Sequence, residues 1–276
     1  MKVMETIYRS GLFTGRTVLV TGGGTGIGLR TAMEFGMLGA RVAIASRKAE
    51  NLEAGMVRLR EAGIEAMATV CNIRDEESVK ACISEVMERF GPINVLVNNG
   101  GGQFPSPAEF INRKGWAAVI ETNLTGTFFM CQEVFNRCMS QHGGSIVSVT
   151  VDNRNGFPMM VHTGAARAGV ENLTRTLANE WGRYGVRINC VAPGTIASSG
   201  LDRYDPQFRE FIYGYGKNNQ TARLGTEAEV AAAIVFLSSP AASFITGQTL
   251  FVDGGQSIYN PLFPPAENDR NPAFGA

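Results

Sequence analysis

The sequence predicts an α/β protein with a single doubly wound, parallel sheet, and three observations support this fold class. Strand-like apolar runs alternate with helix-like segments from residue 16 onward. A glycine-rich turn over residues 21–28 joins the first apolar run to the first helical segment. No linker, repeat or low-complexity stretch divides the 276 residues, which predicts one domain over residues 1–276. We therefore expect seven strands in one sheet, with helices on both of its faces.

The predicted strands are short and rich in Val, Ile and Ala. The fifth has no charged residue, which is typical of a parallel strand that is buried on both faces. The strands are expected at residues 16–20, 41–45, 66–71, 95–97, 145–151, 187–191 and around 251–252.

The predicted helices lie between these strands, and glycine marks several of their ends. Gly39 and Gly63 suit the position just after a helix, where the backbone adopts a left-handed conformation. Gly91-Pro92 ends the third helix in the same way, because proline cannot continue it. The helices are expected at residues 26–38, 49–62, 76–90, 116–139 and 163–184.

Two regions interrupt the alternation. Residues 196–223 contain many aromatic side chains and no strand-like run, and they follow the carboxyl end of a strand, where ligands bind in such sheets. We interpret them as a substrate lid, with a packed surface insertion as the alternative. Residues 259–276 are polar and rich in proline, and we expect an extended C-terminal arm or a frayed tail.

Composition excludes several classes of protein. The formal net charge is zero and no Lys/Arg cluster occurs, so neither nucleic acid nor a membrane surface is an expected partner. Five scattered cysteines are typical of reduced thiols in a cytoplasmic protein, and no metal site is predicted. No run of apolar residues is long enough to span a bilayer, and no signal core precedes the first strand.

The glycine-rich turn has the features of a phosphate-binding loop. It follows a strand and opens a helix, so backbone N–H groups and the positive end of the helix dipole face a ligand there. Gly22 permits a tight turn, Gly26 permits close approach of a pyrophosphate, and Gly28 permits close packing of helix on strand. An ordinary tight turn is the alternative, but the place after the first strand favours a dinucleotide site. The predicted cofactor contacts in this turn are Gly22, Gly24, Thr25, Gly26, Ile27 and Gly28.

The end of the second strand indicates which nucleotide binds. Ser46-Arg47-Lys48 stands where folds that prefer NAD carry an acidic residue. A hydroxyl and two cations favour the additional phosphate of NADP, because Arg forms bidentate, charge-assisted bonds with phosphate. A solvated, basic helix start is the alternative. After the third strand, Asn72 and Ile73 are predicted to contact the adenine, although Asn72 also suits a structural turn. The sequence therefore predicts NADP(H) as the cofactor.

Further motifs resemble those of the short-chain dehydrogenase/reductase family. They are the turn at 21–28, Asn98-Asn99-Gly100-Gly101, Asn123, Pro193-Gly194, Ile245-Thr246-Gly247-Gln248 and Val252-Asp253-Gly254-Gly255. Their order and spacing cover nearly the whole chain. The resemblance implies a Rossmann-type sheet, NAD(P)-dependent redox chemistry and a homotetramer. It also implies cofactor contacts by Asn99, Gly100, Gly101, Arg167, Pro193, Gly194, Thr195 and Ile196.

The catalytic positions depart from the pattern of that family. Val151 stands where the family has serine, and Thr163 and Arg167 stand where it has tyrosine and lysine. Thr163 and Arg167 still share one helix face, because they are four residues apart. However, Thr163 cannot ionise usefully near pH 7 and Arg167 cannot give up a proton, so the usual proton relay is absent. Arg167 can still bond the nicotinamide ribose, and Asn123 matches the family's motif; with Thr163 these are candidate catalytic residues.

A narrower resemblance concerns three longer stretches, at residues 98–107, 121–128 and 162–170. They are similar to the peroxisomal trans-2-enoyl-CoA reductase branch, which is close to the 2,4-dienoyl-CoA reductases. The resemblance implies that Gln103 is a catalytic residue that bonds the thioester carbonyl, with help from a tyrosine just after the fifth strand. This chain has Asp152 or Asn153 near that second place, so half of the pair is unmatched. Bacterial proteins assigned to citronellol or citronellal oxidation are also similar.

Three functions fit these residues. The favoured function is NADPH-dependent reduction of an α,β-unsaturated acyl-CoA thioester, where preorganised donors stabilise the charge that collects on the carbonyl oxygen. Water or a weak acid can protonate the α-carbon in this chemistry. The second is alcohol or aldehyde oxidoreduction of a terpenoid, with His162 as substitute acid, although His162 points about 100° away from Thr163 on a helix. The third is a non-catalytic NADP-binding protein, which the intact turn Pro193-Gly194-Thr195-Ile196 disfavours.

Overall fold

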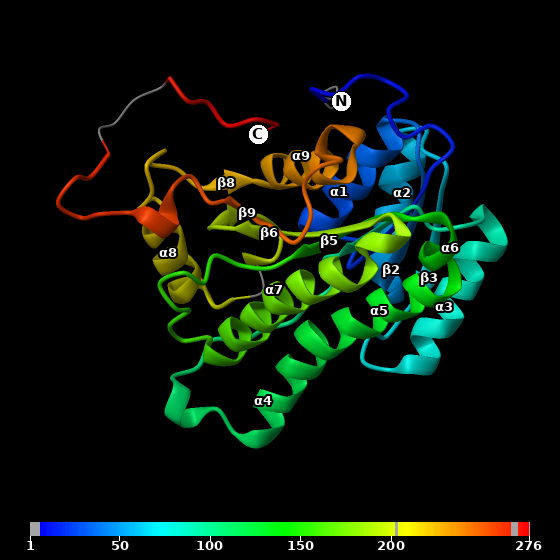
Figure 1. Cartoon of the computed structure of the whole chain (residues 1–276). Helices are drawn as coiled ribbons and strands as arrows, with labels where there is room; N and C mark the ends of the chain where they lie inside the picture. The colour runs from blue at the N-terminus through cyan, green and yellow to red at the C-terminus, as the bar shows by residue number, and fades with distance from the viewer. Residues whose placement is uncertain (1–5, 202–203, 266–269, 276) are drawn as a thin grey trace.

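A seven-stranded, parallel sheet forms the centre of the molecule (Figure 1). The computed structural model describes residues 6–201, 204–265 and 270–275. The strand order is β3-β2-β1-β4-β5-β6-β9, and every neighbouring pair is parallel. The strands are β1 (Thr17–Thr21), β2 (Arg41–Ser46), β3 (Ala66–Val70), β4 (Val95–Asn98), β5 (Gly144–Val149), β6 (Val186–Pro193) and β9 (Thr249–Val252). The predicted fold class is confirmed, because the order reverses between β1 and β4 as in a doubly wound sheet.

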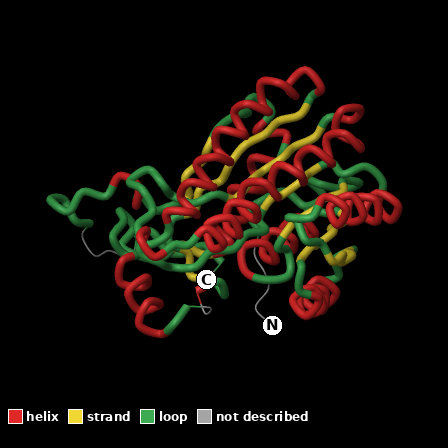
Figure 2. The backbone as a smooth tube through the Cα atoms, turned by 90° about the horizontal axis from the view of Figure 1, so that it is seen from below, coloured by secondary structure: helices red, strands yellow, loops and turns green. Residues whose placement is uncertain are grey.

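Helices cover both faces of the sheet because successive strand residues point to opposite sides. Val18 and Val20 of β1 join one buried cluster, which packs under α1 (Gly26–Met37), α2 (Ala49–Glu61) and α9 (Glu227–Ser238). Leu19 lies between them in the sequence and joins the opposite cluster, under α3 (Glu76–Phe90), α5 (Gly126–Val134) and α7 (Val161–Trp181). Figure 2 shows the helices on either side of the strands. All five cysteines are free and buried.

The helical run between β4 and β5 is longer and less regular than the predicted helix at 116–139. It comprises α4 (Arg113–Ile120), a π-helical turn (Glu121–Thr125), α5, a second π-helical turn (Phe135–Met139) and α6 (Ser140–His142). A π-helical turn inserts an additional residue into the helix and redirects the side chains that follow. The first of these turns carries Asn123.

Four elements were not predicted, and residues 196–223, where no strand was expected, begin with a short one. α9 was missed because its sequence is apolar on every side, so it lacks the polar face that marks a helix by periodicity. Residues 196–223 contain α8 (Pro206–Tyr215), and their first residues do form a strand, β7 (Ile196–Ala197). β7 pairs with β8 (Gly225–Thr226), and two residues are too few to show an alternating pattern. The described 3-10 turns are Ala108–Phe110, Gly182–Tyr184, Pro240–Ala242 and Gln256–Ile258.

The last described residues form hydrogen bonds with the chain just before α9. The Thr226 hydroxyl donates to the Phe274 carbonyl oxygen at 2.7 Å, and Arg223 Nε donates to the Asn271 carbonyl oxygen at 3.2 Å. The predicted arm over 259–276 is therefore described at 259–265 and 270–275, and its other residues lie outside the described part of the chain.

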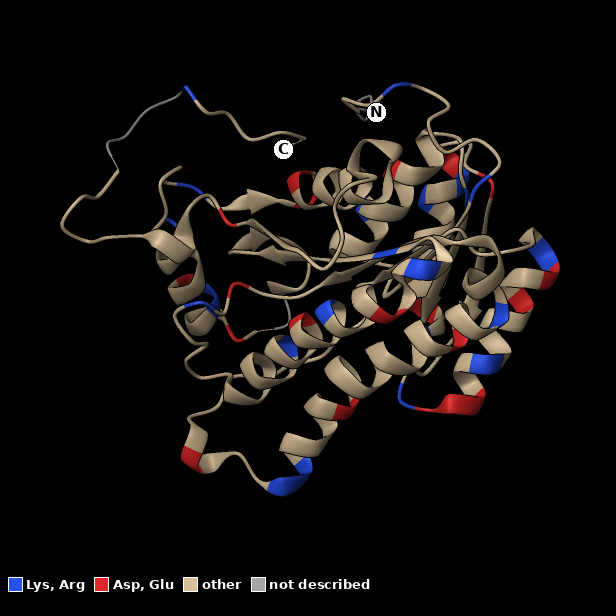
Figure 3. Ribbon diagram, viewed as in Figure 1, with Lys and Arg blue, Asp and Glu red and all other residues tan. Residues whose placement is uncertain are grey.

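Charges of both signs share the surface helices (Figure 3). On α3, for example, Lys80 pairs with Glu77 at 2.7 Å. None of the helices in the described ranges is long and apolar enough to cross a bilayer.

Candidate active site

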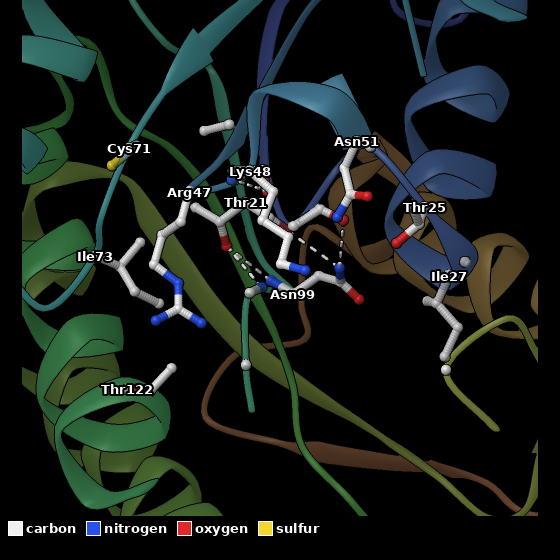
Figure 4. A pocket seen from close by; sticks show the side chains of 18 of the residues that line it. Thr21, Thr25, Ile27, Arg47, Lys48, Asn51, Cys71, Ile73, Asn99 and Thr122 are labelled. Carbon is white, nitrogen blue, oxygen red and sulfur yellow. Dashed lines mark hydrogen bonds between the residues drawn. The ribbon is translucent and has the colours of Figure 1, made fainter. Parts of the chain in front are cut away.

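A cavity of about 270 Å³ lies at the carboxyl ends of β1, β2 and β4 (Figure 4). Parallel strands end at one edge of the sheet, which is why three turns distant in the sequence meet there. Twelve of the predicted cofactor contacts line it: Gly22, Gly24, Thr25, Gly26, Ile27, Ser46, Arg47, Lys48, Ile73, Asn99, Gly100 and Gly101. The remaining lining residues are Thr21, Ala45, Asn51, Cys71, Thr122, Ser198, Ser199 and Gly200.

The phosphate end of the cavity is built by the turn between β1 and α1. Gly22 has φ +63°, and an added Cβ there would lie 2.9 Å from the Asn99 amide. Asn99 Nδ2 donates to the carbonyl oxygens of Thr21 and Gly22 at 3.1 and 3.2 Å, which fixes the turn against the end of β4. Thr25 caps α1 without a side-chain bond to the first amides of the helix, so these N–H groups suit an anionic ligand.

Gly28, a predicted cofactor contact, is not among the described residues that line the cavity. A Cβ there would collide with the Gly22 carbonyl oxygen and the Asn99 amide, so glycine is needed for the packing of helix on strand.

The other end of the cavity is positively charged. Ser46, Arg47 and Lys48 line it, whereas no Asp or Glu occurs among its described lining residues. Arg47 forms no ion pair with any residue that the structure describes, and Lys48 Nζ lies 3.9 Å from Glu50. This arrangement suits a phosphate ester, because the cations are exposed beside the start of α2.

Asn72 is not among the described residues that line the cavity, although its neighbours Cys71 and Ile73 are. Its Oδ1 accepts from the Arg74 N–H at 3.4 Å, and its own N–H donates to Ser78 Oγ at 3.0 Å. These bonds correspond to the structural turn that was the alternative for Asn72.

Arg167 and Asn123 converge on the glycines that follow β4. An added Cβ at Gly101 would collide with the Arg167 guanidinium. Asn123 Oδ1 accepts from the Gly102 N–H at 2.9 Å, while Asn123 Nδ2 donates to the Gly102 carbonyl oxygen at 3.0 Å. The Asn123 amide is thus engaged by the loop, which gives it a positioning role.

Arg167 is a buried cation that faces this loop from α7. Burial lowers the pKa of Arg167 to about 10, so the side chain stays charged at neutral pH. Its Nε is buried and has no hydrogen-bond partner among the described residues. A buried cation with a free donor suits an oxygen-rich ligand such as a ribose, since such a donor is costly when unpaired.

Thr163 and His162 are both fully buried near the start of α7. The Thr163 N–H donates to His162 Nδ1 at 2.8 Å, and a ring nitrogen that accepts such a bond carries no proton. Burial lowers the pKa of His162, which favours the neutral ring. Its Nε2 has no partner among the described residues, and its ring packs edge-on against Phe104 at 4.6 Å.

Gln103 contacts the segment that was predicted to be a lid. Its Nε2 donates to the Tyr204 hydroxyl oxygen at 2.8 Å, although the two residues are 101 positions apart. Asp152, one candidate for the second place beside Gln103, donates its own N–H to the Pro193 carbonyl oxygen. From the sequence, Tyr204 was expected only as one of the lid aromatics, because no local pattern relates it to Gln103.

The turn after β6 supports the cavity without lining it. An added Cβ at Gly194 would lie 2.8 Å from Asp253 Cα, and the Thr195 N–H and hydroxyl both donate to Gln256 Oε1. Pro193 ends β6 and Ile196 begins β7. Because this turn is anchored, the next residues reach the cavity: Ser198, Ser199 and Gly200. These three residues were not predicted, and their only signal in the sequence is their place directly after the predicted turn.

The comparisons with known proteins agree with this geometry. The family model described as "Enoyl-(Acyl carrier protein) reductase" matches residues 22–257. The chain is 34% identical to gluconate 5-dehydrogenase of Gluconobacter oxydans, over 89% of this chain and 96% of that protein. It is also 34% identical to a peroxisomal 2,4-dienoyl-CoA reductase of Danio rerio, over 90% of this chain and 84% of that protein.

Solved structures of related proteins share this fold. A citronellol catabolism dehydrogenase of Pseudomonas aeruginosa is 47% identical, with a TM-score of 0.82 over 91% of this chain and 99% of that one. An actinorhodin polyketide ketoreductase with NADPH is 29% identical, with a TM-score of 0.82 over 91% of this chain and all of the other. The fold and the site define a dinucleotide-binding oxidoreductase. The chain belongs to the short-chain dehydrogenase/reductase family, and the family together with the NADPH complex indicates a nicotinamide cofactor.

Proposed function

We propose that this protein reduces an α,β-unsaturated acyl-CoA thioester, of the trans-2-enoyl type, with NADPH. The observation that carries the proposal is the pair at positions 163 and 167, where a buried Thr and a buried Arg replace the groups of the usual proton relay. Reduction of a conjugated thioester does not need that relay, since its transition state is stabilised by donors to the carbonyl oxygen. The relatives named as 2,4-dienoyl-CoA reductases support this substrate class.

The residues of the site have separable tasks in this reaction. When bound, NADPH supplies the hydride that is added to the β-carbon. Arg167 faces the Gly101 end of the cavity and binds the nicotinamide ribose through its charged donors. Asn123 holds the Gly102 backbone, and this keeps Gln103 at the end of β4. The Gln103 amide N–H groups bind the carbonyl oxygen as negative charge develops there.

The preference for NADPH over NADH is part of the proposal. The support is the cationic end of the cavity, where Arg47 and Lys48 face the solvent without an acidic residue among the described lining. An acidic side chain here would repel the additional phosphate of NADP and accept bonds from a free ribose instead.

Oxidoreduction of a terpenoid alcohol or aldehyde is the second candidate. The structural neighbour named for citronellol catabolism favours it, at 47% identity. An apolar lid also suits a terpenoid chain, and α8 presents the stacked rings of Phe208, Phe211 and Tyr215. In this candidate the proton has no acceptor of the usual kind, because His162 is fully buried and tied to Thr163.

One pair of assays separates the candidates. NADPH absorbance is followed with trans-2-octenoyl-CoA, and NADP⁺ reduction is followed with citronellol. Turnover of the enoyl-CoA with little citronellol oxidation is the expected result. Citronellol oxidation without enoyl-CoA turnover would replace the first candidate by the second.

A homotetramer and a cytoplasmic location remain predictions. Sedimentation equilibrium of the purified protein tests the first, and fractionation of the producing cells tests the second.

A further inference from the structure

Glu227 places a carboxyl group beside the phosphate end of the cofactor cavity. It is the half-buried first residue of α9, and α9 lies side by side with α1 (Figure 1). A Cβ added at Gly26 would lie 3.5 Å from Glu227 Oε1 and 3.3 Å from Ser199 Oγ. Gly26 and Ser199 line the cavity, whereas Glu227 is not among its described lining residues. The carboxyl group therefore lies directly behind the residues that face the predicted pyrophosphate.

Burial is the main influence on the protonation of this carboxyl group. It raises the pKa of Glu227, while the Ser199 backbone N–H and the charges of Arg58 and Arg30 lower it by less. A carboxylate that burial already destabilises takes up a proton more readily when a second negative charge arrives nearby. The protonation of Glu227 is therefore sensitive to a ligand charge at Gly26.

The cations near Glu227 do not neutralise it directly. Arg30 of α1 pairs with the buried Glu34 at 2.9 Å. Arg223 binds both carboxylate oxygens of Glu229, at 2.7 and 3.0 Å. None of the ion pairs in the described part of the chain includes Glu227. Residues 198–200 carry no charge, and the other charged side chains of this region are Arg58 on α2 and Arg270 on the C-terminal arm.

We propose that the Glu227 carboxylate takes up a proton when a dinucleotide pyrophosphate binds beside Gly26, so that cofactor affinity depends on pH. The positive end of the α1 dipole stabilises negative charge near Gly26. A pyrophosphate bound there brings its own negative charges, which repel an ionised Glu227 across the same glycine. Protonation from solvent removes this repulsion, and only the O–H bond of the carboxyl group is formed. The inference concerns the nicotinamide cofactor and does not depend on the acyl substrate.

The direction of the pH dependence follows from this linkage. The bound state holds more protons than the free protein, so the affinity for the cofactor rises as the pH falls through the range in which Glu227 titrates. Above that range the carboxylate stays ionised and the cofactor binds more weakly. Glu227 is thus a positioning residue that acts on the cofactor through its charge.

The test compares Glu227→Gln, which keeps the shape of the side chain, with Glu61→Gln, which removes an exposed carboxylate at the end of α2. The Kd for NADH is measured by fluorescence titration between pH 5 and 8. NADH is the probe because it lacks the additional phosphate of NADPH, which titrates in the same range. The wild type and Glu61→Gln are expected to bind NADH about tenfold more tightly at the acidic end. Glu227→Gln is expected to lose this dependence and to bind about tenfold more tightly than the wild type at the alkaline end.

Calorimetry measures the proton itself. The heat of NADH binding in two buffers with different ionisation enthalpies gives the number of protons taken up by the complex. The wild type and Glu61→Gln are expected to take up part of one proton, and Glu227→Gln is expected to take up less.

Several outcomes overturn the inference. They are an equal pH profile or an equal proton uptake in the wild type and Glu227→Gln, and a wild type that takes up no proton between pH 5 and 8. Weaker NADH binding by Glu227→Gln at every pH also overturns it, because Glu227 would then only support residues 198–200. None of these outcomes changes the proposed function, which the enoyl-CoA assay tests by itself.

Discussion

Thr163 and Arg167 of α7 stand at the positions of the family's proton relay, but their side chains cannot carry out its proton transfer. Arg167 keeps its charge at neutral pH, because burial lowers its pKa only to about 10. Thr163 is fully buried and offers a hydroxyl that does not ionise. These two residues are the reason why we favour a reaction that needs hydrogen-bond donors to a carbonyl oxygen over one that needs a general acid or base.

His162 makes the folded state sensitive to acid. Burial lowers its pKa below the ordinary value of 6.5, so the unfolded chain binds a proton in a range where the folded protein does not. The stability associated with the neutral ring is present above pH 6.5 and is lost as the pH falls from there toward the folded pKa. As the pH falls through this range, His162 should lower the free energy of unfolding by at most about 1.4 kcal/mol per pH unit.

Replacement of His162 tests this. Denaturant unfolding between pH 5 and 8 should show a shallower dependence on pH in His162→Asn than in the wild type. His142→Asn is the control, because His142 is exposed at the end of α6. Equal slopes in the wild type and His162→Asn would contradict the assignment.

At the scale of elements, the π-helical turn between α4 and α5 connects helix geometry to the site. It carries Asn123, whose two bonds to Gly102 position the loop before Gln103. Asn123→Ala should lower the free energy of unfolding by about 2 kcal/mol, since the N–H and the carbonyl oxygen of the half-buried Gly102 both lose their partner. It should also lower kcat/KM for enoyl-CoA by at least about tenfold, because a misplaced catalytic group loses its alignment.

Asn112→Ala provides the matched control within the same helical run. Asn112 caps α4 by accepting from the Gly115 N–H at 2.8 Å. Its loss should cost about 1 kcal/mol of stability and leave kcat/KM unchanged. A similar kcat/KM in Asn123→Ala and Asn112→Ala would show that the loop does not depend on Asn123.

For the whole molecule, the cofactor cavity couples ligand binding to the stability of the sheet that forms it. NADPH at about 100 times its Kd should raise the free energy of unfolding by about 2.7 kcal/mol. Arg47→Asp should weaken NADPH far more than NADH, because it removes a charge-assisted contact with the additional phosphate. Titration and denaturant unfolding with each nucleotide measure both effects.

Arg60→Asp is the control for that change of charge, since Arg60 is exposed near the other end of α2. It should leave both nucleotide affinities as in the wild type. Equal losses for NADPH and NADH in Arg47→Asp would remove the preference for NADP from the proposal.

The fold class could be predicted because its signals are local. Strand runs, glycines after helices and the turn at 21–28 act within a few residues, and the structure confirms the sheet that they predict. The helix α9 could not be predicted in this way, because it packs against both α1 and the sheet and has no polar face. The apolar sequence of α9 indicates only that the segment is buried, and a buried strand would have a similar composition.

The sequence by itself determined the parallel sheet, the glycine turn and the residues that approach the phosphate end of the cavity. Backbone conformation at glycine and the end of a strand depend on neighbours in the chain, so a short motif is enough. Only the tertiary structure decided that Ser198, Ser199 and Gly200 line the cavity and that Tyr204 meets Gln103 across 101 positions. Such contacts depend on where β7, β8 and α8 are placed relative to the ends of the sheet strands, and no local sequence pattern determines that placement.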